Sequence, residues 1–144
     1  MSTVKKEFLR MKVSELIPYE RNPRKNDQAV EDVKQSIIQC GNNDPIEIDE
    51  DNVILSGHTR RKALIELGIE ETDVIRITGM TEQQKRKYRL LANKVAEKSG
   101  WDFELLDWEQ QDLDFEGYDF GFQVEELDIF DDSEPDEKIY VALS

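Results

Sequence analysis

The strongest constraint on the fold is an abrupt change of charge about two thirds of the way along the chain. Residues 1–100 hold 18 Lys and Arg against 17 Asp and Glu, whereas residues 101–144 hold one Lys against 16 Asp and Glu. The balanced part can pack a core and approach a phosphate polyanion, which the acidic part would repel. We therefore expect one domain over residues 1–100, an acidic aromatic helical extension over 101–130, and a linker or tail over 131–144.

Several classes of protein are excluded by composition. Cys40 is the only cysteine, so the chain forms no internal disulfide and offers no cysteine cluster for structural zinc. No apolar run approaches the ~20 residues that cross a bilayer, and the first residues lack the apolar stretch of a signal peptide. We expect a cytoplasmic protein without a membrane partner.

Hydrophobic periodicity predicts an α/β domain in which strands and helices alternate. The pattern indicates strands over 7–13, 46–48, 53–55 and 74–77, and helices over 27–39, 58–67 and 81–99. Gly41, Gly68 and Gly100 are expected helix stops, and Thr81 with Gln84 forms a capping box that opens the last helix.

The acidic extension has its own short pattern. Asp102 is a suitable cap for a helix that carries Phe103 and Leu106, and residues 124–130 are again acidic and amphipathic. Residues 131–137 are typical of a flexible linker. Residues 139–143 are apolar and strand-like, so they can fold back or pair with a partner.

The junction at Ser56-Gly57-His58 carries the chemistry. A strand ends there and a helix begins at once, which leaves backbone N–H groups and the positive end of the helix dipole facing outward. Gly57 lets a ligand approach the backbone, Thr59 adds a hydroxyl, and Arg60 and Arg61 add guanidinium groups suited to phosphate. Adjacent helical residues point about 100° apart, so the two arginines should not serve the same phosphate. The pattern is not a Walker loop.

Residues 85–89 are the one basic run, Lys-Arg-Lys-Tyr-Arg. On a helix such a run is more often a solvated face than a nucleic-acid contact, and the sequence leaves both interpretations open. The aromatic residues of the extension have acidic neighbours, which favours packing on the domain or on a partner over base stacking.

The junction also resembles a known family. The run Leu55-Ser56-Gly57-His58-Thr59-Arg60-Arg61-Lys62-Ala63 resembles the glycine–x–x–arginine box of ParB-type partition proteins. Three other segments match in order: Leu16-Ile17-Pro18 with Asn22-Pro23-Arg24, Gly41 with Asp44-Pro45-Ile46, and Leu91-Ala92-Asn93-Lys94. Over residues 8–100 the chain thus resembles the ParB/sulfiredoxin-like domains, which implies a mixed sheet with short helices.

The resemblance implies a site for CTP, ATP or ADP with Mg²⁺. By position, the phosphates would be held by Gly57, His58, Thr59, Arg60 and Arg61, with Arg24 as a further contact. Pro45 and Ile46 would line the base or ribose. Asn93 would bind metal, and Glu97, one turn later, would replace the family's glutamate, which is Ala92 here. His58 and Glu20 are the candidate catalytic groups.

The implied function is nucleotide binding in DNA partition, modification or phage and mobile-element DNA metabolism, with slow hydrolysis by a CTPase or ATPase activity. The alternatives are a DNA nuclease, a docking or specificity module of a DNA methyltransferase, and a small-molecule kinase. The run from Asn93 to Asp102 most resembles the methyltransferase-linked domains. Implied partners are a nucleotide, DNA, and a protein such as a DNA methyltransferase or another DNA enzyme, bound through the acidic extension. Sulfiredoxin activity is rejected, because the glycine box has no cysteine.

Overall fold

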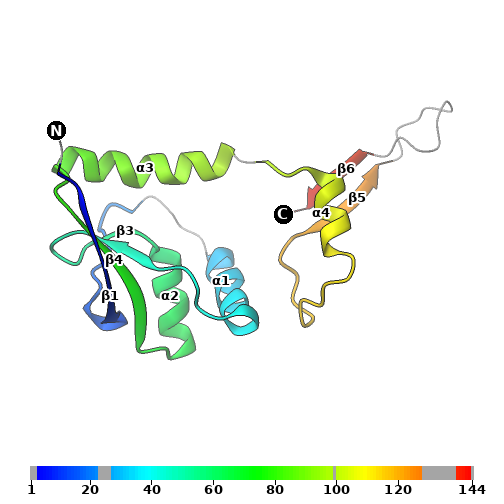
Figure 1. Ribbon diagram of the computed structural model, residues 1–144. Coiled ribbons are helices and arrows are strands. Elements are labelled where there is room, and N and C mark those ends of the chain that lie inside the picture. Colours follow the sequence, from blue (N-terminus) through cyan, green and yellow to red (C-terminus); the bar gives the residue numbers. More distant parts are fainter. Residues whose placement is uncertain (1–2, 23–26, 99, 128–138, 144) are drawn as a thin grey trace. The chain divides into compact units, whose positions relative to one another are not determined.

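The computed structural model describes residues 3–22, 27–98, 100–127 and 139–143 (Figure 1). Contacts within the chain divide it into two compact units, Met1–Lys98 and Ser99–Ser144. Each unit is described by itself.

The first unit is built on a four-stranded mixed sheet. Its strands are β1 (Lys5–Lys12), β2 (Ile46–Ile48), β3 (Ile54–Ser56) and β4 (Glu71–Thr78), in the order β1-β4-β2-β3. β1 is antiparallel to β4, β2 is parallel to β4, and β3 returns antiparallel to β2. The predicted α/β class with a mixed sheet is therefore confirmed, although β1 and β4 begin two and three residues earlier than expected.

Two helices cover one face of this sheet. α1 (Asp27–Cys40) and α2 (His58–Leu67) pack against each other, and a short 3-10 turn over Val13–Glu15 closes the end of β1. The buried cluster contains Val30 and Ile37 of α1, Ala63 and Leu64 of α2, and Ile46, Ile48, Ile54 and Val74 of the sheet. At about 25 cal/mol per Å² of apolar surface, burial of these side chains is the main source of stability.

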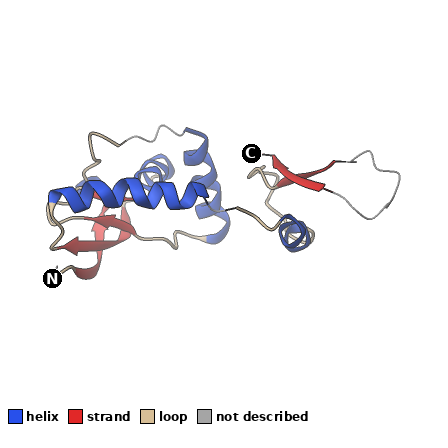
Figure 2. Ribbon diagram, turned by 90° about the horizontal axis from the view of Figure 1, so that it is seen from above, coloured by secondary structure: helices blue, strands red, loops and turns tan. Residues whose placement is uncertain are grey.

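The long helix α3 (Glu82–Lys98) contacts the other face. Successive residues of a strand point to opposite sides, so Glu47 points away from the core that holds Ile46 and Ile48. Its Oε1 accepts a 2.7 Å hydrogen bond from the hydroxyl of Tyr88 on α3. In Figure 2, which looks down from above, α3 is the long helix in front of the sheet.

The start of α3 confirms the predicted capping box. The Thr81 N–H donates to Gln84 Oε1 at 2.8 Å, and the Gln84 N–H donates to Thr81 Oγ1 at 3.1 Å. Each side chain thus satisfies a backbone group that the first helical turn leaves without a partner.

The basic run on α3 is only partly the solvated face that its composition favours, since Arg86 and Lys87 are exposed and two other members are buried. Lys85 is 1% exposed and Arg89 is 6% exposed. The Lys85 ammonium pairs with carboxylates of Asp49, Glu50 and Glu82, which compensates its charge. The prediction is wrong for Lys85 and Arg89 because local sequence does not show which distant residues, such as those of the turn after β2, will meet the helix.

The second unit starts with the predicted cap. Asp102 accepts a 3.2 Å hydrogen bond from the Leu105 N–H, and α4 follows over Phe103–Gln110. Two strands, β5 (Gln123–Leu127) and β6 (Ile139–Leu143), then pair antiparallel. The extension is therefore helical in α4 and becomes a strand at 123–127, and the apolar end of the predicted tail pairs with it. Residues 123–127 are a strand because they form backbone hydrogen bonds with β6, which is distant in sequence. The predicted linker over 131–137 lies outside the described residues.

Across the parts of the chain that the structure describes, no helix has the length and apolar character needed to cross a membrane.

Candidate functional site

The turn between β3 and α2 has a backbone conformation that requires glycine. Gly57 has φ 111° and ψ 21°, in the left-handed region that side chains rarely adopt. A Cβ at this position would also lie 3.0 Å from Ile46 Cγ1 and 3.3 Å from Ile46 Cα. No side chain caps the start of α2. The N-terminal turn of α2 thus keeps its outward N–H groups for a ligand.

A cavity of about 410 Å³ opens in front of this turn. Its wall is formed by residues of the loop before α1, of α1 itself, of the loop that leads into β2, of β2 and β4, of the β3–α2 junction, and of α3. Its polar lining comprises Asn22, Asp44, Glu47, Ser56, His58, Thr59, Arg60 and Arg89. The volume is within the range of small-molecule sites, and the lining combines both signs of charge.

The cavity brings together five of the residues that the sequence singles out. Gly57, His58, Thr59, Arg60 and Pro45 all line it. Ile46 is fully buried beneath Gly57 and belongs to the core. The roles assigned to these residues remain predictions.

Other predicted site residues lie elsewhere. Arg61 follows Arg60 but is absent from the cavity lining, in keeping with the 100° between neighbouring helical positions. Glu20 lines a different cavity of about 360 Å³, together with Asp49 and Asp51. Arg24 lies outside the described residues, as do the side chains of Asn93 and Glu97 on α3.

Arg60 is held over the cavity by the loop that precedes β2. Its Nη1 donates to Asn42 Oδ1 at 2.7 Å, and its Nη2 lies 3.3 Å from Asp44 Oδ2. The Arg60 side chain is 14% exposed, whereas that of Asp44 is 82% exposed. A pair with one exposed partner contributes little, so a phosphate can take the place of Asp44 at small cost.

His58 fastens the loop before α1 to the start of α2. Its Nε2 accepts a 3.0 Å hydrogen bond from the Tyr19 N–H. Burial, followed by the positive charges of Arg89, Arg61 and Lys62, lowers the pKa of His58 to about 4. The imidazole is therefore neutral at pH 7, and the lone pair that would take up a proton already has a partner. This geometry suits a positioning role, and the acid–base role stays a prediction.

A pH titration of the single histidine tests this description. We expect its imidazole NMR resonances to titrate near pH 4 rather than near the usual 6.5. Because the unfolded chain takes up this proton first, the stability associated with neutral His58 is full above pH 6.5 and declines as the pH falls toward 4. A midpoint near 6.5 in the folded protein would contradict the buried, hydrogen-bonded arrangement.

Arg89 and Glu47 line the cavity but were not among the predicted site residues. The Nε of Arg89 donates to the Ile54 carbonyl at 3.0 Å, and the Arg89 guanidinium carbon lies 3.8 Å from the centre of the Tyr19 ring. The side chain thereby joins α3, β3 and the loop before α1 at the cavity wall. The only signal in the sequence was its spacing, since Arg89 lies four residues after Lys85 and shares its helical face.

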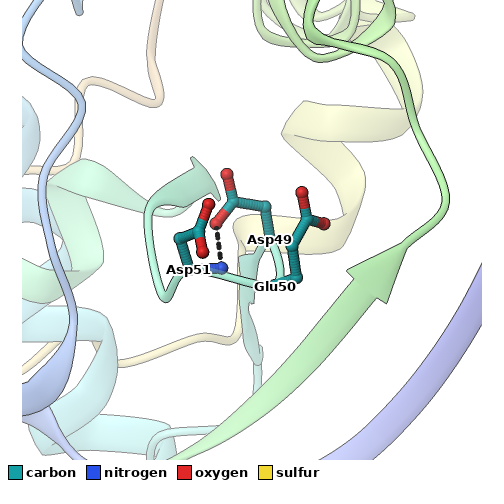
Figure 3. A group of neighbouring side chains, drawn as sticks. All are labelled: Asp49, Glu50 and Asp51. Carbon is teal, nitrogen blue, oxygen red and sulfur yellow. Dashed lines mark hydrogen bonds between the residues drawn. The ribbon is translucent and has the colours of Figure 1, made fainter.

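A cluster of carboxylates at the turn after β2 does not fit the implied magnesium site. Figure 3 shows Asp49, Glu50 and Asp51, whose ligand oxygens lie within 4.8 Å of one another. Asp49 Oδ1 accepts the N–H groups of Asp51 and Val53, each at 2.9 Å. The Lys85 ammonium lies 3.2 Å from Asp49 Oδ2 and supplies the positive charge, so the cluster is an ion-paired part of the fold.

The cavity itself has a donor set that does suit Mg²⁺. Carboxylates of Asp44 and Glu47 line it, and carboxylate oxygens are ligands that this cation prefers alongside phosphate oxygens. The side chains of the predicted ligands Asn93 and Glu97 lie outside the described part of the chain, so their metal-binding role remains a prediction.

Comparison with solved structures establishes the class of fold. The chain resembles one crystal form of the Pnob8-like ParB-N domain (TM-score 0.55, 18% identity, 76% of this chain and 46% of that one). It also resembles a C-terminally truncated chromosome-partitioning protein ParB from Caulobacter crescentus complexed with CTP-γ-S (TM-score 0.59, 17% identity, 72% of this chain and 62% of that one). These matches show a ParB N-domain fold, and the chain spans 46% and 62% of the two solved chains.

Sequence comparison adds the family. The chain is 36% identical over 76 residues to the ParB-like nuclease domain-containing protein YnaK of Escherichia coli K12. The match covers 52% of this chain and 87% of that relative. No family model matches the chain. The protein belongs to the ParB-like nuclease domain family, as its glycine box predicts.

Proposed function

We propose that the cavity at Gly57 binds a nucleoside triphosphate with Mg²⁺ in the service of DNA transactions. The observation that carries this proposal is the cavity of about 410 Å³ at the uncapped start of α2, with two guanidinium groups in its wall. CTP is the first candidate, because the structurally similar Caulobacter ParB is complexed with CTP-γ-S. ATP and ADP are the other candidates.

In this mechanism the phosphates lie against the first turn of α2. The backbone N–H groups after Gly57 and the Thr59 hydroxyl donate hydrogen bonds to phosphate oxygens. Arg60 exchanges its exposed Asp44 partner for a phosphate oxygen and keeps its bond to Asn42. Asp44 and Glu47 are the described carboxylates that would hold Mg²⁺, which would supply positive charge against the phosphates when bound.

Thermal unfolding of the full chain tests nucleotide binding. Melting is measured with CTP, ATP, ADP and GTP, each with Mg²⁺, and release of inorganic phosphate is followed in the same samples. A ligand at a hundred times its dissociation constant raises the free energy of unfolding by about 2.7 kcal/mol. Unchanged melting with millimolar amounts of every nucleotide would refute the proposal.

Replacement of Arg60 by alanine should weaken nucleotide binding by about 10- to 100-fold, because a hydrogen bond to a charged group contributes about 1.5–3 kcal/mol. Lys62→Ala is the matched control, since Lys62 is exposed on the same helix and absent from the cavity lining. Isothermal titration gives both affinities, and the melting of each free variant separates binding from folding. Equal losses in the two variants would show that general charge, not the cavity, attracts the nucleotide.

A further inference from the structure

The second unit contains a cavity lined by aromatic rings. Phe115, Tyr118, Phe120 and Phe122 line a space of about 310 Å³, together with Gln110 and Asp119. The ring centres of Tyr118 and Phe120 are 4.7 Å apart and those of Phe115 and Phe120 are 5.4 Å apart, both edge-on. No side chain in residues 100–122 is fully buried. This aromatic cluster therefore remains partly open to solvent.

The charge of the same segment selects the sign of a ligand. Residues 101–122 contain eight acidic side chains and no Lys or Arg. Asp119 lines the cavity, and its Oδ1 accepts a 2.8 Å hydrogen bond from the Gly121 N–H, which positions the carboxylate. The faces of aromatic rings attract cations, so rings and carboxylate favour the same kind of group. A phosphate or an acidic peptide would be repelled.

The unit also exposes apolar side chains. Trp101 is 58% exposed, Leu105 64%, Trp108 70% and Leu113 54%. Large exposed side chains surrounded by charged residues are characteristic of protein interaction surfaces. A small inorganic cation would leave this apolar area uncovered, whereas an amphipathic peptide would cover it.

We propose that residues 100–122 bind a basic, amphipathic segment of a partner protein, with one Arg or Lys side chain of that segment in the aromatic cavity. Apolar residues of the segment contact the exposed tryptophans and leucines, and its remaining basic residues pair with the surrounding carboxylates. This interaction is independent of nucleotide binding at Gly57, so either can fail without the other.

Tryptophan fluorescence of the full chain reports on this unit alone, because both tryptophans of the protein, Trp101 and Trp108, belong to it. The probes are a short amphipathic peptide of leucine, alanine and arginine, the same peptide with glutamate for arginine, and spermine. We expect saturable binding of the arginine peptide, no binding of the glutamate peptide, and at least about 10-fold weaker binding of spermine, which has no apolar face. The proposal would be overturned if the glutamate peptide, or spermine, bound as tightly as the arginine peptide.

Variants separate the cavity from general acidity. Phe120→Ala should weaken the arginine peptide about 10-fold through loss of a cation–π partner. Asp119→Asn should weaken it several-fold while its amide oxygen still accepts the Gly121 N–H. Asp112→Asn is the matched control, because Asp112 is exposed and absent from the cavity lining. If Asp119→Asn and Asp112→Asn weaken the arginine peptide equally, general acidity attracts the peptide and the assignment of the cavity is overturned. This comparison does not depend on whether Phe120→Ala folds.

Discussion

Replacement of Lys85 by alanine is expected to lower the free energy of unfolding by about 3–5 kcal/mol. Lys85 is 1% exposed and pairs with three acids, of which Asp49 is itself only 4% exposed. Removal of the ammonium leaves the Asp49 carboxylate buried without a countercharge. Urea unfolding of the full chain, followed by circular dichroism, measures the change.

Two comparisons show whether the buried charge causes this loss. Glu82→Gln removes an 86%-exposed partner from the same cluster and should cost less than about 1 kcal/mol. Asp49→Asn keeps an oxygen for the N–H groups of Asp51 and Val53 but removes the charge. In the Lys85→Ala background it should recover about 1–3 kcal/mol. If the stability losses of Lys85→Ala and Asp49→Asn simply add in the double variant, the buried charge of Asp49 is not the cause of the loss.

The same cluster sets a direction for pH dependence. The hydrogen bond from Lys85 is the main cause that lowers the pKa of Glu50 below its usual 4.5. The stability linked to Glu50 is therefore present above pH 4.5 and is lost as the pH falls through the lower, folded value. The pKa of Lys85 is raised above its ordinary value of 10.5, so the stability that the charged Lys85 contributes is lost only as the pH rises above 10.5. Lys85→Ala should thus show a shallower loss of stability in acid.

Replacement of Gly57 by alanine is expected to lower the free energy of unfolding by about 2–4 kcal/mol, because two penalties combine. A non-glycine residue at φ 111° is strained by about 1–3 kcal/mol. The new Cβ would also lie 3.0–3.3 Å from atoms of the fully buried Ile46, which cannot move without disturbing the core. Thermal and urea unfolding measure the effect.

Gly68→Ala is the matched control for this substitution. Gly68 caps the other end of α2 with φ 73°, and a Cβ there would meet no atom within 4 Å. Gly68→Ala should therefore lower the free energy of unfolding by only about 1 kcal/mol, which arises from backbone strain alone. If both variants lose the same stability, the contact with Ile46 is unimportant and the backbone of Gly57 is not held against the core.

Features determined by neighbouring residues follow from the sequence alone. Gly57 and Gly68 bound α2 because only glycine adopts the left-handed conformation there without strain. Thr81 and Gln84 begin α3, and Asp102 begins α4, through hydrogen bonds that span three residues. The glycine box and its accompanying segments indicated the family, which the similarity to the Escherichia coli relative confirms.

Features that depend on distant pairs were decided by the tertiary structure. Residues 123–127, Gln-Val-Glu-Glu-Leu, lack the polar–apolar alternation of a strand, and they form one because they pair with β6, more than ten residues away. Lys85 and Arg89 resemble a charged surface until Asp49, Glu50 and Tyr19 are placed beside them. Arg60 and Arg61 are equivalent in sequence, yet only Arg60 lines the cavity.

The sequence by itself determined where the helices of the first unit start, which turn needs glycine and which part of the chain is acidic, because these follow from local conformation and composition. Only the tertiary structure decided which charges are buried, which arginine faces the cavity and which group accepts the Tyr19 N–H. These properties depend on residues far apart in the chain, such as Tyr19 and His58, which are 39 positions apart, and no local pattern encodes such a distance.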